Sequence, residues 1–523
     1  MASRIWRGPN IEIPPAKTIL DLIAEAAARQ PEHVALADSV SGGTVTYGQL
    51  IGCTRRAASA LRARGAGPGS CLAIYAPNAP DWAIAALAIM HLGGAVTGAS
   101  PQLKTDELVR HLSLTKAGWL LTAPPLLDIA SQAAAKVGGI DVIVSGNGTE
   151  GAVASYGLVV EAAAVDDPAV GPDAIAMLPF SSGTTSLPKP VEVTHLALVT
   201  AALQAQAAFG FRCDDKLLAL APFSFIAGSA IILFAGLAAG ASLVTVPRFK
   251  FEAVLDVVER ECISVALFMP PIMRMLAQRP DIEGRDFSHL RLILCGGAHV
   301  PAEVEEGVAR RLGTTVVQAY GMTETVATIA VSPPAAPRAG TCGKPFPLVE
   351  LRIVDPQTGR DQAANETGEV WTRGPQLMKG YFGDPAATLE ALTADGWLRT
   401  GDLGFFDVDG YLHLCGRLKD LIKVNANAVA PGELEVLLAS HPAVADVAVV
   451  GQADEKMGEI PVAYVVSRRE IGADDLMKWV AERVAPYKRI RAVEFVEDIP
   501  RSPAGKILRR LLTKRASVGS ERG

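Results

Sequence analysis

The segment SSGTTSLPKP, residues 181–190, has the composition of a loop that binds an anion. It gathers hydroxyl side chains around Gly183 and ends in Lys189, which lies between two prolines. Glycine lets backbone N–H groups approach phosphate oxygens, while hydroxyls and a lysine add donors and positive charge. The hydroxyl-bearing residues are Ser181, Ser182, Thr184, Thr185 and Ser186. The pattern predicts a phosphate-binding loop, and a Ser/Thr-rich surface turn is the alternative.

The loop differs from the nucleotide-binding motif GxxxxGK[ST]. Gly183 and Lys189 have the spacing of the first glycine and the lysine of that motif. Pro188, however, stands at its second glycine, and Pro190 stands at the hydroxyl residue that binds magnesium. The segment is therefore not a Walker A loop, although its donors suit the same kind of ligand.

Short apolar segments alternate with helix-like segments before and after this loop. Helical spacing is found at residues 18–31, 81–94 and 251–261. Strand-like apolar runs are found at residues 71–77, 118–124, 141–146, 174–180 and 265–270. Such alternation is typical of parallel sheets with helices on both faces, where ligands bind outside the carboxyl ends of the strands. Because the loop follows the run 174–180, it lies where a ligand is expected.

The pattern changes after about residue 345. Residues 351–355, 368–374 and 410–416 read as short antiparallel strands with tight turns, and a compact α+β module follows Arg417. We therefore expect an α/β fold with two domains, residues 1–418 and 419–523, divided within 416–420. The first would combine mixed, mostly parallel sheets, flanking helices and a small β-barrel-like part.

Composition restricts the class of protein. The 523 residues include 49 Lys and Arg against 55 Asp and Glu, a net charge of −6, without the clustered basic residues of a nucleic-acid-binding face. Seven cysteines are scattered with no CxxC pair, which is typical of reduced thiols in a cytoplasmic protein. The first residues lack the apolar core of a signal peptide.

Residues 217–247 contain no charged side chain, and the run is long enough to be mistaken for a membrane span. Gly236, Gly240 and Ser242 interrupt the run, and the segment after them turns to β-branched residues. A buried helix of about a dozen residues followed by a buried strand fits better. We expect no membrane span.

Four further segments follow the loop. They are QAYGMTET (318–325), GWLRTGDLG (396–404), GRLKDLIK (416–423) and RSPAGKILRR (501–510). In content and order the five motifs resemble the signatures of the adenylate-forming superfamily: acyl-CoA synthetases, luciferases and peptide-synthetase adenylation domains. The fragments PYKR, LMKGY and APGELE are most similar to 4-coumarate–CoA ligase-like acyl-CoA ligases. The resemblance spans about residues 180–510 and implies that the loop holds the β- and γ-phosphates of ATP.

The resemblance implies a role for each motif residue. Thr184, Thr185 and Lys189 would donate to the triphosphate, which the loop would bind together with Ser181, Ser182 and Gly183. Thr323 would reach the α-phosphate. Tyr320, beside Gly321, would stack on adenine, Gly297 and Ala298 would line the adenine and acyl sites, and Asp402, supported by Arg417, would bind the ribose. Glu324, with Thr185, would hold Mg²⁺, which takes oxygen ligands. A helix-start carboxylate at Glu324 and a solvated turn at Asp402 are the alternatives.

Lys506 would be carried into the site by a small mobile C-terminal domain. There it would bridge the substrate carboxylate and the α-phosphate and offset developing charge. By the resemblance, Lys419 occupies the hinge position of the family. A hinge is needed because the domain must withdraw Lys506 before a second nucleophile enters. Lys423 follows on the face that resembles the second-step surface.

Three departures from the family pattern bear on the substrates. Relatives usually have glycine at 186 and 190. They usually have histidine where Phe225 stands and often tyrosine where Ala227 stands. Ala426 replaces a glycine at the place where the pantetheine arm of CoA passes the backbone, and Ala428 replaces a polar residue. The third departure leaves adenylation untouched and brings the acceptor into question.

The predicted activity is ATP-dependent ligation of a carboxylic acid through acyl-AMP, with release of pyrophosphate and acyl transfer to CoA. A medium-sized aryl or alkyl acid is expected from Phe225, Ala227, Gly296 and Ala298. The expected cofactors are ATP, Mg²⁺ and CoA. Three alternatives remain: transfer to an amine or to a carrier-protein thiol, a non-enzymatic nucleotide sensor, and a luciferase-like oxygenase.

Overall fold

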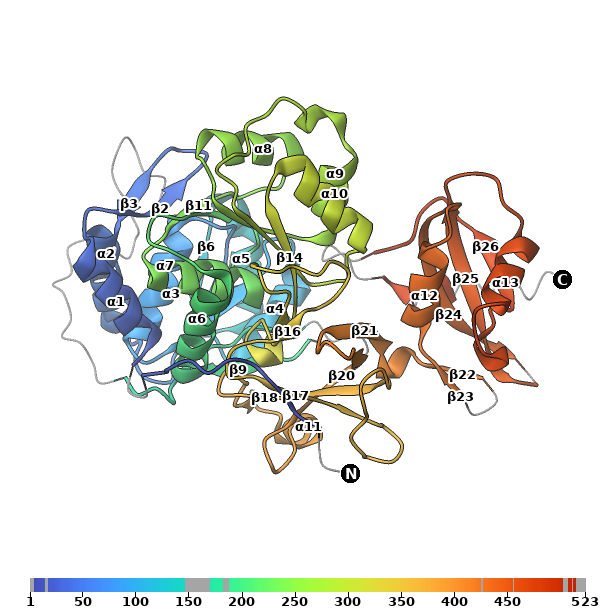
Figure 1. Cartoon of the computed structure of the whole chain (residues 1–523). Helices are drawn as coiled ribbons and strands as arrows, with labels where there is room; N and C mark the ends of the chain where they lie inside the picture. The colour runs from blue at the N-terminus through green and yellow to red at the C-terminus, as the bar shows by residue number, and fades with distance from the viewer. Residues whose placement is uncertain are drawn as a thin grey trace.

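The computed structural model describes residues 4–14, 17–145, 170–181, 188–424, 427–454, 456–501, 507–509 and 511–513. Within them, three sheets and their helices form a large N-terminal part, and a fourth sheet forms a smaller C-terminal part (Figure 1). This is the α/β architecture predicted from the sequence.

The first sheet has the strand order β19-β9-β8-β5-β4-β6-β7. Its strands are β4 (Cys71–Tyr75), β5 (Ala95–Ala99), β6 (Trp119–Thr122), β7 (Asp141–Val144), β8 (Ile175–Met177), β9 (Val191–Thr194) and β19 (Gly380–Tyr381). The strands from β8 to β7 along this order run parallel, while β9 and β19 are added in antiparallel fashion. The phosphate-loop motif connects β8 to β9 and so lies where the sheet changes direction.

The second sheet has the order β16-β15-β14-β13-β12-β10-β11-β2-β3. Its strands are β2 (Val34–Asp38), β3 (Thr44–Thr46), β10 (Lys216–Ala219), β11 (Ser242–Thr245), β12 (Val265–Phe268), β13 (Leu292–Cys295), β14 (Thr315–Tyr320), β15 (Ala330–Val331) and β16 (Lys344–Pro345). From β2 to β14 along this order the strands are parallel. The motifs after β13 and β14 therefore leave the sheet at the same edge.

Helices form layers on both faces of these sheets. One core joins the two sheets through α1 (Ile19–Arg29), α2 (Tyr47–Ala63), α3 (Pro80–His91) and α6 (His195–Phe209). The outer face of the second sheet packs against α8 (Phe251–Arg260), α9 (Pro270–Gln278) and α10 (Ala302–Leu312), and that of the first against α4 (Thr105–Thr115) and α5 (Leu127–Val137). Short 3₁₀ helices lie at Pro124–Leu126, Pro280–Ile282 and Pro486–Lys488. Burial on both faces explains the nearly continuous apolar strands.

The uncharged segment has the structure expected for it. A π-helix (η2, Ala227–Phe234) continues into α7 (Ala235–Ala239), and β11 follows within the core. Among the described residues, no helix combines the length and the apolar character needed to cross a membrane.

An antiparallel sheet occupies the place of the predicted barrel-like part. Its strands are β1 (Trp6–Arg7), β17 (Glu350–Val354), β18 (Gly368–Arg373), β20 (Leu398–Phe406) and β21 (Leu412–Arg417), with α11 (Pro385–Ala391) beside them. The chain then passes through a 3₁₀ helix, η5 (Leu418–Asp420), into the C-terminal part.

The C-terminal part is an α+β unit with its own core. It contains β22 (Ile422–Val424), β23 (Asn427–Val429), α12 (Pro431–Ala439), β24 (Val444–Asp454), β25 (Gly458–Ser467), α13 (Ala473–Ala481) and β26 (Ala492–Phe495) (Figure 1). Arg274 of α9 lies 3.6 Å from Asp446 of β24, so an ion pair joins the two parts. The exact division at residue 418 stays a prediction.

Candidate active site

The base of the predicted phosphate loop is closed by the backbone. Phe180 and Pro190 form an antiparallel bridge, and the Ser181 N–H donates to the carbonyl of Lys189 at 2.9 Å. The buried Ser181 hydroxyl also donates to that carbonyl, at 3.4 Å. The predicted phosphate ligands Ser182, Gly183, Thr184 and Thr185 lie outside the described residues. The structure therefore establishes where the loop begins and ends.

Lys189 is held at the exit of the loop. Its Nζ lies 2.9 Å from Oδ2 of Asp384 and 5.4 Å from the centroid of the Tyr381 ring. Asp384 is the N-cap of α11, and its Oδ1 accepts from the N–H of Ala387 at 2.9 Å. The Ala387 N–H and the lysine both hold the pKa of Asp384 below its usual range. Sequence reasoning did not identify Asp384, because 195 positions separate it from Lys189.

Asp384→Asn is expected to lower the KM for ATP about two- to fivefold, the range of an exposed ion pair. Asparagine keeps the helix cap, but it removes the negative charge that competes with the triphosphate for Lys189. ATP-dependence of pyrophosphate exchange measures the effect. Asp106→Asn, which breaks the surface pair between Asp106 and Lys136, is the matched control and should leave the KM unchanged. A higher KM in Asp384→Asn would contradict this reading, since the carboxylate would then orient Lys189 for phosphate.

Glu324 lies on a tight turn that follows β14. The turn includes the 3₁₀ helix η4 (Thr323–Thr325), and the carboxylate is buried with 5% exposure. A Cβ on Gly321 would lie 1.6 Å from the carbonyl oxygen of Ala327, so only glycine fits there. Val326 and Ala327 adopt φ of 48° and 85°, in the left-handed region. Backbone strain of this kind persists where the surrounding structure fixes a functional group.

Contacts from two directions hold the Glu324 turn. The Thr323 hydroxyl donates to the carbonyl of Phe180 at 3.4 Å, which joins the turn to the segment between β8 and the phosphate loop. The Tyr381 hydroxyl donates to Oε1 of Glu324 at 2.8 Å. Burial, and then the carboxylate, raise the pKa of Tyr381, so the phenol keeps its proton. The structure thus brings Thr323 and Glu324 to the base of the loop, and their roles stay predictions.

The site has the ligand chemistry of a nucleotide-bound magnesium ion. No group of three or more His, Cys, Asp or Glu side chains within the described ranges is arranged to hold a metal alone. Mg²⁺ is usually bound by one or two carboxylates together with substrate phosphates. A single buried carboxylate beside the base of a phosphate loop fits that requirement, and Glu324 supplies it.

Tyr320, Asp402 and Arg417 form a polar cluster in which the tyrosine and the aspartate are buried and the arginine is partly exposed. The Tyr320 hydroxyl donates to Oδ2 of Asp402 at 2.8 Å, and Nε of Arg417 lies 2.9 Å from Oδ1. Tyr320 and Asp402 are 8% and 6% exposed, and Arg417 faces Asp402 across β20 and β21. Burial is the largest cause that raises the pKa of Tyr320, and the charge of Asp402 is the second. The phenol therefore keeps its proton and stays a hydrogen-bond donor. The residues predicted for adenine and ribose therefore lie together.

Gly297 and Ala298 lie in the loop after β13, the neighbour of β14 in the sheet. Gly297 has φ of 86°, which favours glycine. A Cβ on Gly296 would lie 3.1 Å from the carbonyl of Ala319, so the loop runs close to the strand that carries Tyr320. These residues leave the sheet at the edge where Tyr320 and Glu324 are found.

The segment that carries Phe225 is fixed by Asn78, which sequence reasoning missed. The buried Asn78 amide donates to the carbonyls of Ala219 and Ala221 at 2.8 and 2.9 Å, and its oxygen accepts from the N–H of Phe223 at 2.8 Å. Phe225 is 49% exposed, although it is large and apolar. The signal for Asn78 in the sequence is its position just after the apolar run 71–77, which contains β4.

Three predicted site residues follow Arg417 in the sequence: Lys419, Lys423 and Lys506. Lys423 is exposed on β22, and its N–H donates to Oε2 of Glu459 at 2.7 Å. Lys419 lies in η5, two positions after Arg417. Lys506 lies outside the described residues, and an antiparallel bridge joins Arg501 and Ile507, which stand on either side of that gap in the sequence.

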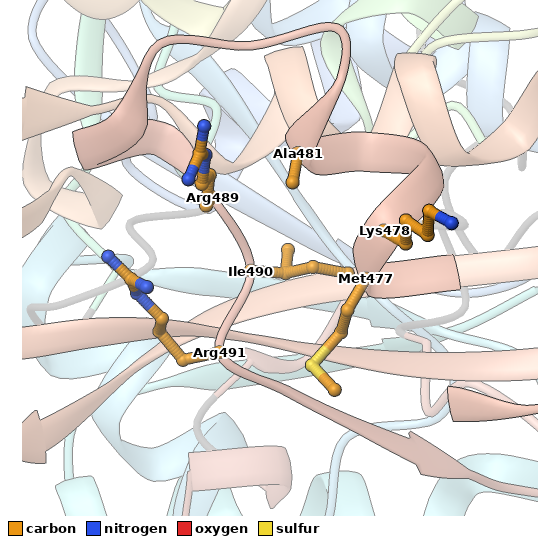
Figure 2. A pocket seen from close by; sticks show the side chains of 6 residues that line it. All are labelled: Met477, Lys478, Ala481, Arg489, Ile490 and Arg491. Atoms are coloured by element: carbon orange, nitrogen blue, oxygen red, sulfur yellow. The ribbon is translucent and has the colours of Figure 1, made fainter. Parts of the chain in front are cut away.

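A hollow on the surface of the C-terminal part is separate from this site (Figure 2). It is lined by Met477, Lys478, Ala481, Arg489, Ile490 and Arg491. In Figure 2 the two arginine side chains lie on one side of the hollow and Lys478 on the other, so their charges do not converge. The hollow therefore has no evident role in the chemistry of the motifs.

Solved structures of known proteins share the fold. ATP-bound MatB from Rhodopseudomonas palustris has a TM-score of 0.86 and 27% identity, over 95% of this chain and 99% of that one. Amide bond synthetase McbA from Marinactinospora thermotolerans has a TM-score of 0.86 and 30% identity over 95% and 99%. The fold and the site together define an adenylate-forming enzyme.

The family models match at both ends of the chain. The AMP-binding enzyme model matches residues 23–382, and the AMP-binding enzyme C-terminal domain model matches residues 433–506. The chain is 36% identical to 4-coumarate–CoA ligase 5 of Oryza sativa subsp. japonica over 98% of its own length and 97% of that protein. The chain therefore belongs to the AMP-binding enzyme family, as its motifs predict, and is an adenylate-forming ligase of the acyl-CoA ligase type.

Proposed function

We propose that the protein activates a medium-sized aryl or alkyl carboxylic acid with ATP and transfers the acyl group to CoA. The observation that supports this most is the convergence of the Tyr320–Asp402–Arg417 cluster and Glu324 beside the base of the phosphate loop. The Tyr320–Asp402–Arg417 cluster suits a nucleoside, and Glu324 beside the loop suits a metal-bound polyphosphate.

In the first step, a carboxylate oxygen of the acid attacks the α-phosphorus of ATP, and pyrophosphate leaves. Thr184, Thr185 and Lys189 would bind the β- and γ-phosphates, while Thr323 would donate to the α-phosphate. Glu324 and Thr185 would hold Mg²⁺, which neutralises phosphate charge when bound. Asp402 would accept hydrogen bonds from the ribose, with Tyr320 against adenine.

In the second step, the CoA thiolate attacks the acyl carbon and AMP leaves. We propose that residues 419–523 form the small domain that delivers Lys506 for the first step and withdraws it for the second. η5 and Lys419 lie where the chain enters that domain, which suits a hinge. Lys423, exposed on β22, would then face the acceptor.

The acid class is supported by the relatives and by the segment at 222–228. The rice relative is named as a 4-coumarate–CoA ligase, and 4-coumarate is an aryl acid. A Cβ on Gly228 would lie 2.2 Å from the carbonyl oxygen of Pro222, so the turn that presents Phe225 is tight. Ala227 stands where tyrosine is common among relatives, which leaves more room for the acid.

The second candidate is an amide synthetase that shares the acyl-AMP step. The likeness to amide bond synthetase McbA supports it. Ala426 lies outside the described residues. The motif resemblance implies that it stands where the family typically has glycine beside the pantetheine arm. A methyl group in a packed tunnel costs about 1–3 kcal/mol, which slows CoA capture by about ten- to a hundredfold without abolishing it.

The expected result is acid-dependent ATP–pyrophosphate exchange, with thioester formed when CoA is added. The measurement is an acid panel of aryl and alkyl compounds, assayed for exchange and then for products with CoA or with amines. No exchange with any acid would contradict the activation step. If exchange occurred and an amide but no thioester was formed, the acceptor would be an amine and not CoA.

Ala426→Gly sharpens this test of the acceptor. Glycine removes the methyl group from the proposed CoA path and leaves the adenylation residues in place. CoA-dependent turnover should therefore rise while pyrophosphate exchange stays constant. Equal changes in both half-reactions would contradict a role for position 426 in admitting CoA.

A further inference from the structure

The segment Met378–Phe382 connects the Glu324 turn to the phosphate loop. On one side, the N–H of Met378 donates to the backbone carbonyl of Glu324 at 2.9 Å, and the Tyr381 hydroxyl donates to the Glu324 carboxylate at 2.8 Å. The turn is therefore held through both its backbone and its side chain by one short segment.

On its other side, the same segment pairs with the strand that leaves the loop. Tyr381 pairs with Val191, and the N–H of Phe382 donates to the carbonyl of Pro190 at 2.9 Å. The N–H of Lys379 donates to the carbonyl of Glu192, also at 2.9 Å. The residue that contacts Glu324 is thus paired with the strand at the exit of the loop.

We propose that Tyr381 is a positioning residue that fixes the Glu324 carboxylate for the metal ion of metal–ATP. The proposal deepens the function above and rests on Glu324 as a metal ligand. A carboxylate can accept about four hydrogen bonds, so the bond from Tyr381 is compatible with metal ligation by the same group. Hydrogen-bond partners of this kind orient ligating carboxylates, and their loss typically costs about 10- to 100-fold in metal affinity.

Geometry separates this role from a packing role. Tyr381 is only partly buried, and its ring also lies beneath the Lys189 ammonium at 5.4 Å. Phenylalanine would keep the ring and its contact with Lys189 and would remove only the hydroxyl. The substitution Tyr381→Phe therefore isolates the hydrogen bond to Glu324.

The experiment measures ATP binding to Tyr381→Phe by calorimetry, once with Mg²⁺ and once with EDTA and no metal. Binding needs no acid, so a failure of the proposed ligase activity would not affect the readout. With Mg²⁺ the Kd for ATP should rise about tenfold, whereas without metal it should stay within about twofold. The Mg²⁺ concentration that half-saturates pyrophosphate exchange should rise in parallel.

Two further variants control the result. Tyr47→Phe removes the hydroxyl of a fully buried tyrosine, which donates to the carbonyls of Leu237 and Ala241 at 3.0 and 2.8 Å. It should lower the Tm without changing the metal dependence. In Glu324→Gln the effect of Tyr381→Phe should disappear, because the two residues act through one interaction.

Three outcomes would overturn the proposal. They are an equal loss of ATP affinity with and without Mg²⁺, no loss in either condition, and a full additional loss when Tyr381→Phe is combined with Glu324→Gln.

Discussion

Lys506→Ala is expected to slow acid-dependent pyrophosphate exchange by about a hundred- to a thousandfold, the loss typical of one transition-state donor. The lysine would stabilise charge that develops as the carboxylate attacks the α-phosphate. An interaction made mainly in the transition state lowers kcat and leaves ground-state binding almost unchanged. The Kd for ATP should therefore stay close to that of the wild type.

Pre-steady-state acyl-AMP formation and ATP calorimetry measure the two quantities separately. Lys514→Ala removes a lysine eight positions further along the same basic tail and is the matched control. It should leave both quantities unchanged, since no step of the proposed reaction uses it. A loss of ATP affinity as large as the loss of turnover in Lys506→Ala would mean that Lys506 is a binding residue.

The second large effect is expected for Asp402→Asn. Asp402 is buried, accepts from Tyr320 at 2.8 Å and pairs with Arg417 at 2.9 Å. Asparagine has nearly the same size but no charge, so the pair with Arg417 and a charged acceptor for the ribose are both lost. Hydrogen bonds to charged groups contribute about 1.5–3 kcal/mol, so the KM for ATP should rise about ten- to a hundredfold.

The KM for ATP in pyrophosphate exchange and the Tm should be measured together. Asp407→Asn is a demanding control, because Asp407 follows the same strand, is 9% exposed and pairs with Arg338 and His413 at 3.2 and 3.0 Å. It should lower the Tm and leave the KM for ATP unchanged. If the two variants shifted the KM equally, the Asp402 effect would be a general loss of stability and not a loss of nucleotide contact.

Local patterns in the sequence predicted strands and helices that are found in the structure. The helical spacing that became α1 and the apolar run that became β4 depend on neighbours a few positions away. The signals in the uncharged segment are equally local, since Gly240 caps the C-terminus of its buried helix. Such signals are local and can be read directly from the order of residues.

The site required more than local patterns. Its motifs indicated which residues bear the chemistry, but Asn78, Tyr381 and Asp384 were not assigned roles. Each acts on a residue far away in the chain, and the hydrogen bond between Tyr381 and Glu324 spans 57 positions. No period or spacing in the sequence predicts such a contact, because it depends on which strands become neighbours.

The sequence by itself determined the class of the protein, the kinds of donor and acceptor at each motif, and the alternation of strands and helices. It could do so because side-chain chemistry and local periodicity are properties of short segments. Only the tertiary structure decided that β9 pairs with β19, and so that Lys189 meets Asp384 and Tyr381 meets Glu324. The physical reason is that strand order follows from burial of the whole core, which brings distant segments within hydrogen-bond distance.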